Sequence, residues 1–127
     1  MLYLDTSAAV KLVNRELESD AVLDYLRQLP DERLVSAGLI RTELRRAVGH
    51  PSEPVETLLR SLAMVELTGS LLDEAGIIGP GSALRGLDAI HLVAARRLGA
   101  DLLAVVTYDR RMVAAATSLG ITAVSPS

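Results

Sequence analysis

The segment LLAVVTYD at residues 102–109 decides the fold class, because an uninterrupted apolar run is followed within a few residues by an acid. A strand that is apolar at every position is buried on both faces, as in parallel sheets covered by helices. Similar short runs predict strands at residues 1–4, 34–36, 63–67 and 121–124. Apolar spacing and capping residues predict helices at 8–13, 17–29, 39–48, 54–62, 70–75, 87–98 and 110–119, with a loop at 76–86. This alternation predicts an α/β fold with a central parallel sheet of about four to five strands flanked by helices.

The composition fits one globular domain over residues 1–127. Half of the 127 residues are hydrophobic, which argues against disorder. The absence of cysteine excludes disulfide frameworks, thiolate metal sites and cysteine nucleophiles. With no Phe or Trp and three Tyr, the chain lacks the rings of a base-stacking platform. A net charge of −3 argues against a generally basic surface, but it allows a local basic patch beside an acidic site.

The sequence also bears on localisation. Its N-terminus reaches Asp5 without a basic region followed by an apolar one, which argues against a signal peptide. The longest uncharged run, residues 112–127, is shorter than the roughly 20 residues that a membrane span requires. We therefore expect a soluble cytoplasmic protein with no membrane partner.

Four acids fall where a parallel sheet places its ligands, beyond the carboxyl ends of the strands. Asp5 closes the first predicted strand, and Asp109 lies two residues past the strand at 102–107. Glu43 and Asp88 lie in the first turns of helices that begin at the same edge. Each acid has a local alternative: Asp88 and Asp109 as helix N-caps, and Glu43 as an i,i+3 partner of Arg46.

Four carboxylates at one edge repel one another unless cations lie among them. Oxygen ligands without cysteine suit a hard divalent ion, Mg²⁺ or Mn²⁺. Their convergence therefore predicts a metal site.

Four segments, LYLDTSA at 2–8, RTEL at 41–44, LDAIHLVAA at 87–95 and VTYDRR at 106–111, together resemble a PIN domain. More narrowly, the chain resembles the VapC toxins of VapBC toxin–antitoxin modules over essentially its whole length. The LDAIHL segment is the most specific of these motifs. The resemblance implies a metal-dependent endoribonuclease that acts as the toxin of a type II toxin–antitoxin system.

The resemblance also assigns roles to the four acids, which match the family's acidic quartet. Asp5 and Asp88 are expected to bind Mg²⁺ directly, and Mn²⁺ is expected to substitute for it. Asp109 is expected to be a ligand, directly or through water, or to orient the attacking water. Glu43 is expected to serve a second metal or to act as general base.

Two hydroxyl residues lie near the acids and are expected to support them. Ser7 fits a helix N-cap better than a ligand, and Thr107 is expected to hydrogen-bond a carboxylate of the quartet. His91, one turn after Asp88, is interpreted as a structural histidine rather than a metal ligand, because hard ions rarely select imidazole. His50 is interpreted as a loop residue.

Two further features concern phosphate binding. The segment Gly79-Pro80-Gly81 lacks the Lys-Ser/Thr of a phosphate-binding loop, which argues against a nucleotide site. Five arginines near the acids could hold RNA phosphates or could be solvated surface residues: Arg41, Arg45, Arg85, Arg110 and Arg111.

Two rival functions remain to be weighed. A phosphoacceptor receiver domain needs a lysine after a late strand, and the only lysine is Lys11. A catalytically silent PIN-like scaffold that binds a partner is the alternative, against which the intact quartet argues.

The expected partners are an RNA substrate, a cognate VapB-type antitoxin and a second copy of the chain. The homodimer is implied by the resemblance and by the few charges after Met112, which suggest an apolar surface. The alternative is that this segment is simply core.

Overall fold

The computed structural model describes residues 1–79 and 83–127. Part of the predicted loop at 76–86, including Pro80 and Gly81 of the segment examined for phosphate binding, lies outside the described residues. Among the described residues, no helix is long and apolar enough to cross a membrane.

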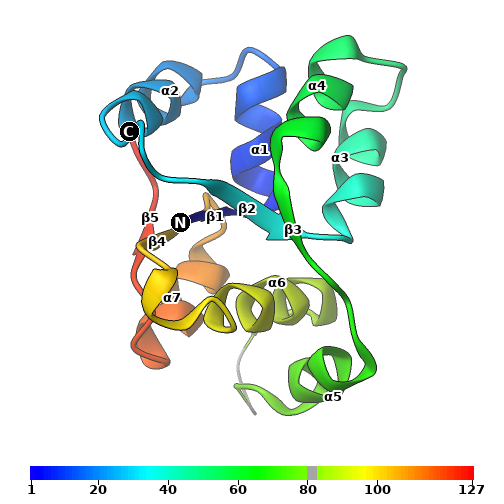
Figure 1. Cartoon of the computed structure of the whole chain (residues 1–127), viewed down its shortest axis with the longest axis vertical. Helices are drawn as coiled ribbons and strands as arrows, with labels where there is room; N and C mark the ends of the chain where they lie inside the picture. Colours follow the sequence, from blue (N-terminus) through cyan, green and yellow to red (C-terminus); the bar gives the residue numbers. More distant parts are fainter. Residues whose placement is uncertain (80–82) are drawn as a thin grey trace.

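Five parallel strands form the central sheet, in agreement with the predicted four to five (Figure 1). They are β1 (Leu2–Leu4), β2 (Leu34–Ala37), β3 (Ala63–Val65), β4 (Ala104–Val106) and β5 (Ala123–Val124), in the order β3-β2-β1-β4-β5. β1 is central and pairs with β2 on one side and β4 on the other. The direction in which successive strands are added reverses beside β1, which is where open α/β sheets bind ligands.

Helices cover both faces of the sheet (Figure 1). One face carries α1 (Thr6–Val13), α2 (Ser19–Arg27), α3 (Ile40–Val48) and α4 (Glu53–Ser61). The other carries α5 (Gly69–Ile77), α6 (Gly86–Arg96) and α7 (Arg110–Ser118), with a short 3₁₀ helix, η1 (Gly99–Asp101), after α6.

The strand side chains alternate between the two cores, as the side-chain period of two in a strand requires. Leu2 and Leu4 of β1 are buried under α1 to α4, whereas Tyr3 between them is buried under α5 and α6. β4 repeats the pattern, with Val106 on the first side and Val105 on the second. Because helices cover both faces of the sheet, every residue of β1 and β4 is buried.

Local caps explain where several elements differ from the predicted bounds. α1 begins at Thr6 rather than residue 8, because Asp5 caps it. α5 begins at Gly69, because the Thr68 side chain accepts a hydrogen bond from the amide of Leu71. The helix then runs to Ile77. β3 ends at Val65 rather than at residue 67.

The uncharged C-terminal segment contributes to the core. Met112 and Ala116 of α7 are fully buried against Leu92 of α6. Residues 112–127 are all described, and none of their large apolar side chains is exposed. The predicted broad apolar surface is therefore not found in this segment, and the alternative that the segment is core holds for Met112 and Ala116 but not for its half-buried and exposed residues. The exposed large apolar side chains are Leu17, Leu72, Ile77, Leu87 and Leu103.

Candidate active site

Asp5 lies at the carboxyl end of the central strand, where the sheet positions it. Leu4 is in register with Val106 of β4, and the amide of Asp5 donates to the carbonyl of Val106 at 3.3 Å. Asp5 therefore stands beside Thr107, the first residue after β4. This is the point in the sheet at which a ligand is expected.

The Asp5 carboxylate is buried and held by three donors. The Ser7 hydroxyl donates to Oδ1 at 2.6 Å and the Ala8 amide donates to the same oxygen at 3.0 Å. The Thr107 hydroxyl donates to Oδ2. Burial raises the pKa of Asp5, and these hydrogen bonds oppose the rise.

This arrangement separates two predictions about the hydroxyls. The hydrogen bond from Thr107 to a quartet carboxylate is confirmed. The N-cap assignment of Ser7 is wrong, because Asp5 caps α1 and Ser7 is inside the helix. The Ser7 hydroxyl instead donates to Asp5 and accepts from the amide of Tyr108 at 2.9 Å, so it joins the start of α1 to the end of β4.

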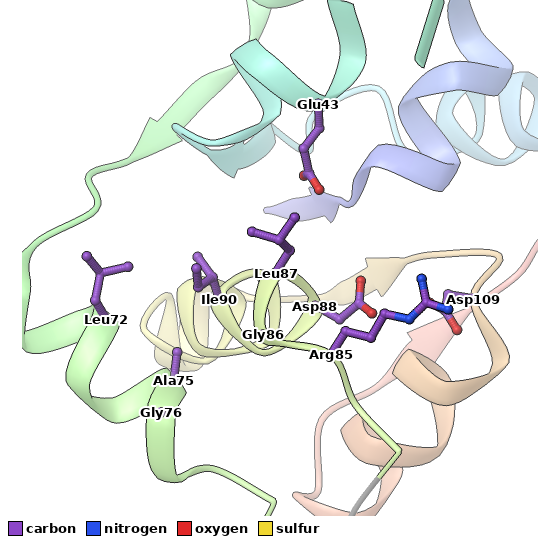
Figure 2. Close-up of a pocket in the computed structure, with 10 residues that line it drawn as sticks. All are labelled: Glu43, Leu72, Ala75, Gly76, Arg85, Gly86, Leu87, Asp88, Ile90 and Asp109. Carbon is purple, nitrogen blue, oxygen red and sulfur yellow. The ribbon is translucent and has the colours of Figure 1, made fainter. Parts of the chain in front are cut away.

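Glu43 approaches from α3, on the opposite side of the pocket from α6 (Figure 2). Its Oε1 accepts from the Thr6 hydroxyl at 2.7 Å and from Nε2 of His91 at 2.7 Å. Burial acts to raise the pKa of Glu43, but the hydrogen bonds from His91 and Thr6 outweigh it and the pKa is lowered. The predicted alternative of a pair with Arg46 is therefore wrong.

Asp88 and Asp109 lie at the starts of two helices. Asp88 is the third residue of α6, whose N-cap position is Arg85, so the N-cap alternative for Asp88 is wrong. Asp109 does cap α7, because its Oδ1 accepts from the amide of Arg111 at 2.9 Å. A carboxylate has a second oxygen, so the cap leaves Asp109 available to a ligand.

The acids are close enough to affect one another. The pKa of Asp88 is raised by burial and then by the charges of Asp109 and Asp5. The charge of Glu43 adds to the rise, and His91 acts against it. The structure thus brings the four predicted acids together at one edge of the sheet.

A pocket of about 640 Å³ opens at this edge. Glu43, Asp88 and Asp109 line its polar part, and Leu72 and Ile90 belong to its apolar part between α5 and α6 (Figure 2). As the side chains stand, no group of three His, Asp or Glu residues within 1–79 and 83–127 forms a cluster that could hold a metal ion.

The predicted arginines are divided between three surroundings. Arg85 lines the pocket and extends across Asp88 toward Asp109 (Figure 2). Arg110 and Arg111 line a neighbouring hollow of about 400 Å³. Arg41 is exposed on α3, while Arg45 of the same helix is engaged by both carboxylate oxygens of Glu56 at 3.0 and 2.8 Å.

Sequence reasoning missed a buried chain of polar groups behind Glu43. His91 is 2% exposed, and its Nδ1 lies 2.6 Å from the Tyr3 hydroxyl while its Nε2 contacts Glu43. The interpretation of His91 as a buried structural residue agrees with this, but its partners were not predicted. The sequence likewise assigned no role to Thr6, whose hydroxyl donates to Glu43. His50 lies in the loop between α3 and α4, as expected.

Residues 2–117 match the PIN domain family. Curated relatives from Mycobacterium tuberculosis cover nearly the whole chain. Ribonuclease VapC46 is 44% identical over 130 residues, covering 99% of this chain and 98% of the relative. Ribonuclease VapC35 is 40% identical over 134 residues, covering 99% and 97%. Ribonuclease VapC47 is 37% identical over 133 residues with the same coverage as VapC35.

A solved structure has the same fold. The crystal structure of Mycobacterium tuberculosis VapC20, described as a sarcin-ricin loop cleaving toxin, superposes with a TM-score of 0.74. The match covers 99% of this chain and 100% of the other, at 15% sequence identity. At that identity, the likeness establishes the fold alone.

Proposed function

Because the chain belongs to the PIN-domain family and, within it, to the VapC ribonucleases, we propose that it is a metal-dependent endoribonuclease and the toxin of a type II toxin–antitoxin system. The observation that carries the proposal is the gathering of Asp5, Glu43, Asp88 and Asp109 at the carboxyl edge of β1 and β4. Burial and then the charges of Asp109 and Asp5 raise the pKa of Asp88 there, and a cation bound among the carboxylates would relieve that cost.

The donor set suits Mg²⁺ or Mn²⁺, because it consists of carboxylate oxygens. Asp5, Asp88 and Asp109 would hold the ion. When bound, such an ion activates water for attack on a phosphodiester and neutralises charge on the phosphoryl oxygens. Asp5 is already oriented for this by the hydroxyls of Ser7 and Thr107.

Glu43 would work from the other side of the pocket. Its lowered pKa keeps the carboxylate ionised, which suits a ligand of a second ion. The same lowering makes Glu43 a weaker general base, because a base is most effective when its pKa lies near the working pH. Arg85 is suited to a phosphate of the RNA, because it lines the same pocket and arginine binds phosphate oxygens in a bidentate manner.

The proposed partners follow from the relatives. A VapB-type antitoxin would neutralise the protein by placing a basic side chain among Asp5, Glu43 and Asp88, where it would supply the charge that the metal otherwise brings. A homodimer and a cytoplasmic location belong to the same proposal. Light scattering on the purified Asp5→Asn variant tests the dimer: a dimer mass is expected, and a monomer mass across micromolar concentrations would contradict it.

The decisive experiment is cleavage of total RNA by the purified protein with Mg²⁺, Mn²⁺ or EDTA. We expect cleavage with either metal and none with EDTA. Asp5→Asn should lose at least about 10³-fold in activity, because removing a metal ligand forfeits several kcal/mol of transition-state stabilisation. The variant should keep the wild-type circular dichroism spectrum.

Two results would contradict the proposal. Full cleavage by Asp5→Asn, with contaminating nucleases excluded, would remove the quartet from the chemistry. A folded wild-type protein that cleaves no RNA but binds a partner would favour the catalytically silent scaffold.

A further inference from the structure

His91 is buried in the core, yet it connects directly to the pocket. The ring lies on α6, which packs beneath β2, and is 2% exposed. One ring nitrogen contacts Glu43 on the pocket side, and the other contacts Tyr3 on β1. The Tyr3 and His91 rings meet edge to face, with centroids 5.7 Å apart at 75°, so packing fixes the plane of the imidazole.

The chemistry of the three groups determines where the ring hydrogen lies. An ionised carboxylate only accepts hydrogen bonds, so the 2.7 Å contact with Oε1 of Glu43 requires a hydrogen on Nε2. In a neutral imidazole, Nδ1 is then an acceptor, and the Tyr3 hydroxyl at 2.6 Å supplies the donor. In a charged imidazolium, both nitrogens carry hydrogen. Nε2 therefore donates to Glu43 in either charge state.

The hydrogen bond from His91 occupies one carboxylate oxygen of Glu43 and leaves the other without a partner among the described residues. Oε1 accepts from both His91 and Thr6, whereas no hydrogen bond to Oε2 is found in the described part of the chain. Glu43 also lines the pocket that holds Asp88 and Asp109. The buried groups thus hold one side of the carboxylate and leave the other available.

We propose that His91 is a positioning residue that fixes Oε1 of Glu43 through Nε2 and presents Oε2 to the pocket, while Tyr3 hydrogen-bonds Nδ1 and holds the far side of the ring. The part that concerns catalysis rests on the proposed ribonuclease function. Partners of this kind, one step removed from the reacting groups, commonly alter activity by about 10–100-fold when they are lost.

Two variants of similar character separate this role from simple core packing. In His91→Asn the amide can still reach Tyr3 but is too short to reach Glu43, whereas in His91→Gln an amide N–H lies near the position of Nε2. We expect His91→Asn to lower kcat by about 10–100-fold with KM within about twofold. His91→Gln should recover to within about threefold of the wild type. His50→Asn, in an exposed loop, is the matched control and should retain wild-type kcat.

A double-mutant cycle with Glu43→Gln makes the test specific. If His91 acts through Glu43, His91→Asn should cost less than about twofold when Glu43 is already substituted. Equal losses in both backgrounds, or equal kcat for His91→Asn and His91→Gln when both are folded, would overturn the proposal.

¹⁵N NMR spectra of the histidine rings in the metal-free protein test the hydrogen bond between His91 and Glu43. They need no activity measurement, and they remain possible even if His91→Asn fails to fold. The chain has two histidines, so His50→Asn assigns the signals. We expect Nε2 of His91 to carry hydrogen in both the wild type and Tyr3→Phe, because the ionised carboxylate of Glu43 needs a donor at that nitrogen whichever group faces Nδ1. A wild-type spectrum without hydrogen on Nε2 would overturn the proposal. Absence of cleavage by the wild type, with Nε2 protonated, would instead count against the ribonuclease function.

Discussion

The four acids form two pairs that are held in different ways. Asp5 and Glu43, the fixed pair, each accept hydrogen bonds from two side chains, at least one of which belongs to a distant element. Asp88 and Asp109, the open pair, are held much less. Asp109 is bound by one backbone amide of its own helix, and no hydrogen bond to the Asp88 carboxylate is found within residues 1–79 and 83–127.

The difference indicates a division of tasks. Donors that orient a carboxylate before a ligand arrives reduce the cost of binding, which suits the fixed pair to define the geometry of the site. Carboxylates with few partners and with mutual repulsion gain most from a cation, which suits the open pair to respond to it.

Loss of an orienting donor from the fixed pair should lower activity strongly, though less than loss of Asp5 itself. Thr107→Val keeps the shape of the side chain but removes the donor to Asp5 and the acceptor for the Asp109 amide. We expect cleavage to fall by about 10–100-fold, and the free energy of unfolding to fall by about 1–2 kcal/mol. Thr117→Val, on the exposed face of α7, is the matched control. Equal cleavage rates for the two variants would contradict the orienting role.

The open pair should govern the response to metal. At ten times its Kd, Mg²⁺ should stabilise the wild type by about 1.4 kcal/mol. For a chain of this size that is a rise in Tm of a few degrees, measurable by thermal denaturation with and without EDTA. Asp88→Asn should lose most of this rise, whereas Asp20→Asn, an exposed acid paired with Arg15, should retain it. An undiminished rise in Asp88→Asn would place the metal elsewhere.

The arginine beside the open pair should contribute more to RNA binding than the arginine of α3 that is already engaged. Arg85→Ala should weaken RNA binding by about 1 kcal/mol, roughly fivefold, and reduce the salt dependence by about one counterion. Arg45→Ala should change affinity by less than about twofold, because Glu56 occupies its guanidinium. RNA affinity would be measured by fluorescence anisotropy in the Asp5→Asn background, so that the RNA is not cleaved during the measurement. Equal effects would show that the pocket does not select between them.

The smallest effect concerns stability without metal. Folding raises the pKa of Asp88, so the folded state loses stability as pH rises from the ordinary aspartate pKa of 3.8 through the raised value. Asp88→Asn removes this loss and should be more stable than the wild type at pH 7 in EDTA. The gain should stay below about 1 kcal/mol, because solvent screens a half-exposed carboxyl.

Urea denaturation at pH 7 and pH 4.5 tests the sign. The advantage of Asp88→Asn should shrink as pH falls toward 3.8 and vanish below it, where the wild-type carboxyl becomes protonated in both states. An advantage that is constant with pH would show that the ionisation of Asp88 is not its cause.

Local patterns in the sequence were sufficient for the architecture. The run at 102–107 and its counterparts predicted the strands, because a strand buried on both faces must be apolar at every position. The same patterns predicted Asp5, Glu43, Asp88 and Asp109 at one edge, since the ends of parallel strands and the starts of the following helices meet there. Element ends were less exact, as with Ser7, because two polar residues close in sequence, here Asp5 and Ser7, can compete to cap one helix.

Only the tertiary structure decided how the acids are held. Tyr3 and His91 are 88 residues apart, and His91 and Glu43 are 48 apart, so no local spacing links them. The same holds for the C-terminal segment, whose lack of charge is compatible with a surface or a core until α7 is seen against α6. Sequence patterns specify the period and the ends of each element, whereas hydrogen bonds between distant elements depend on how those elements pack.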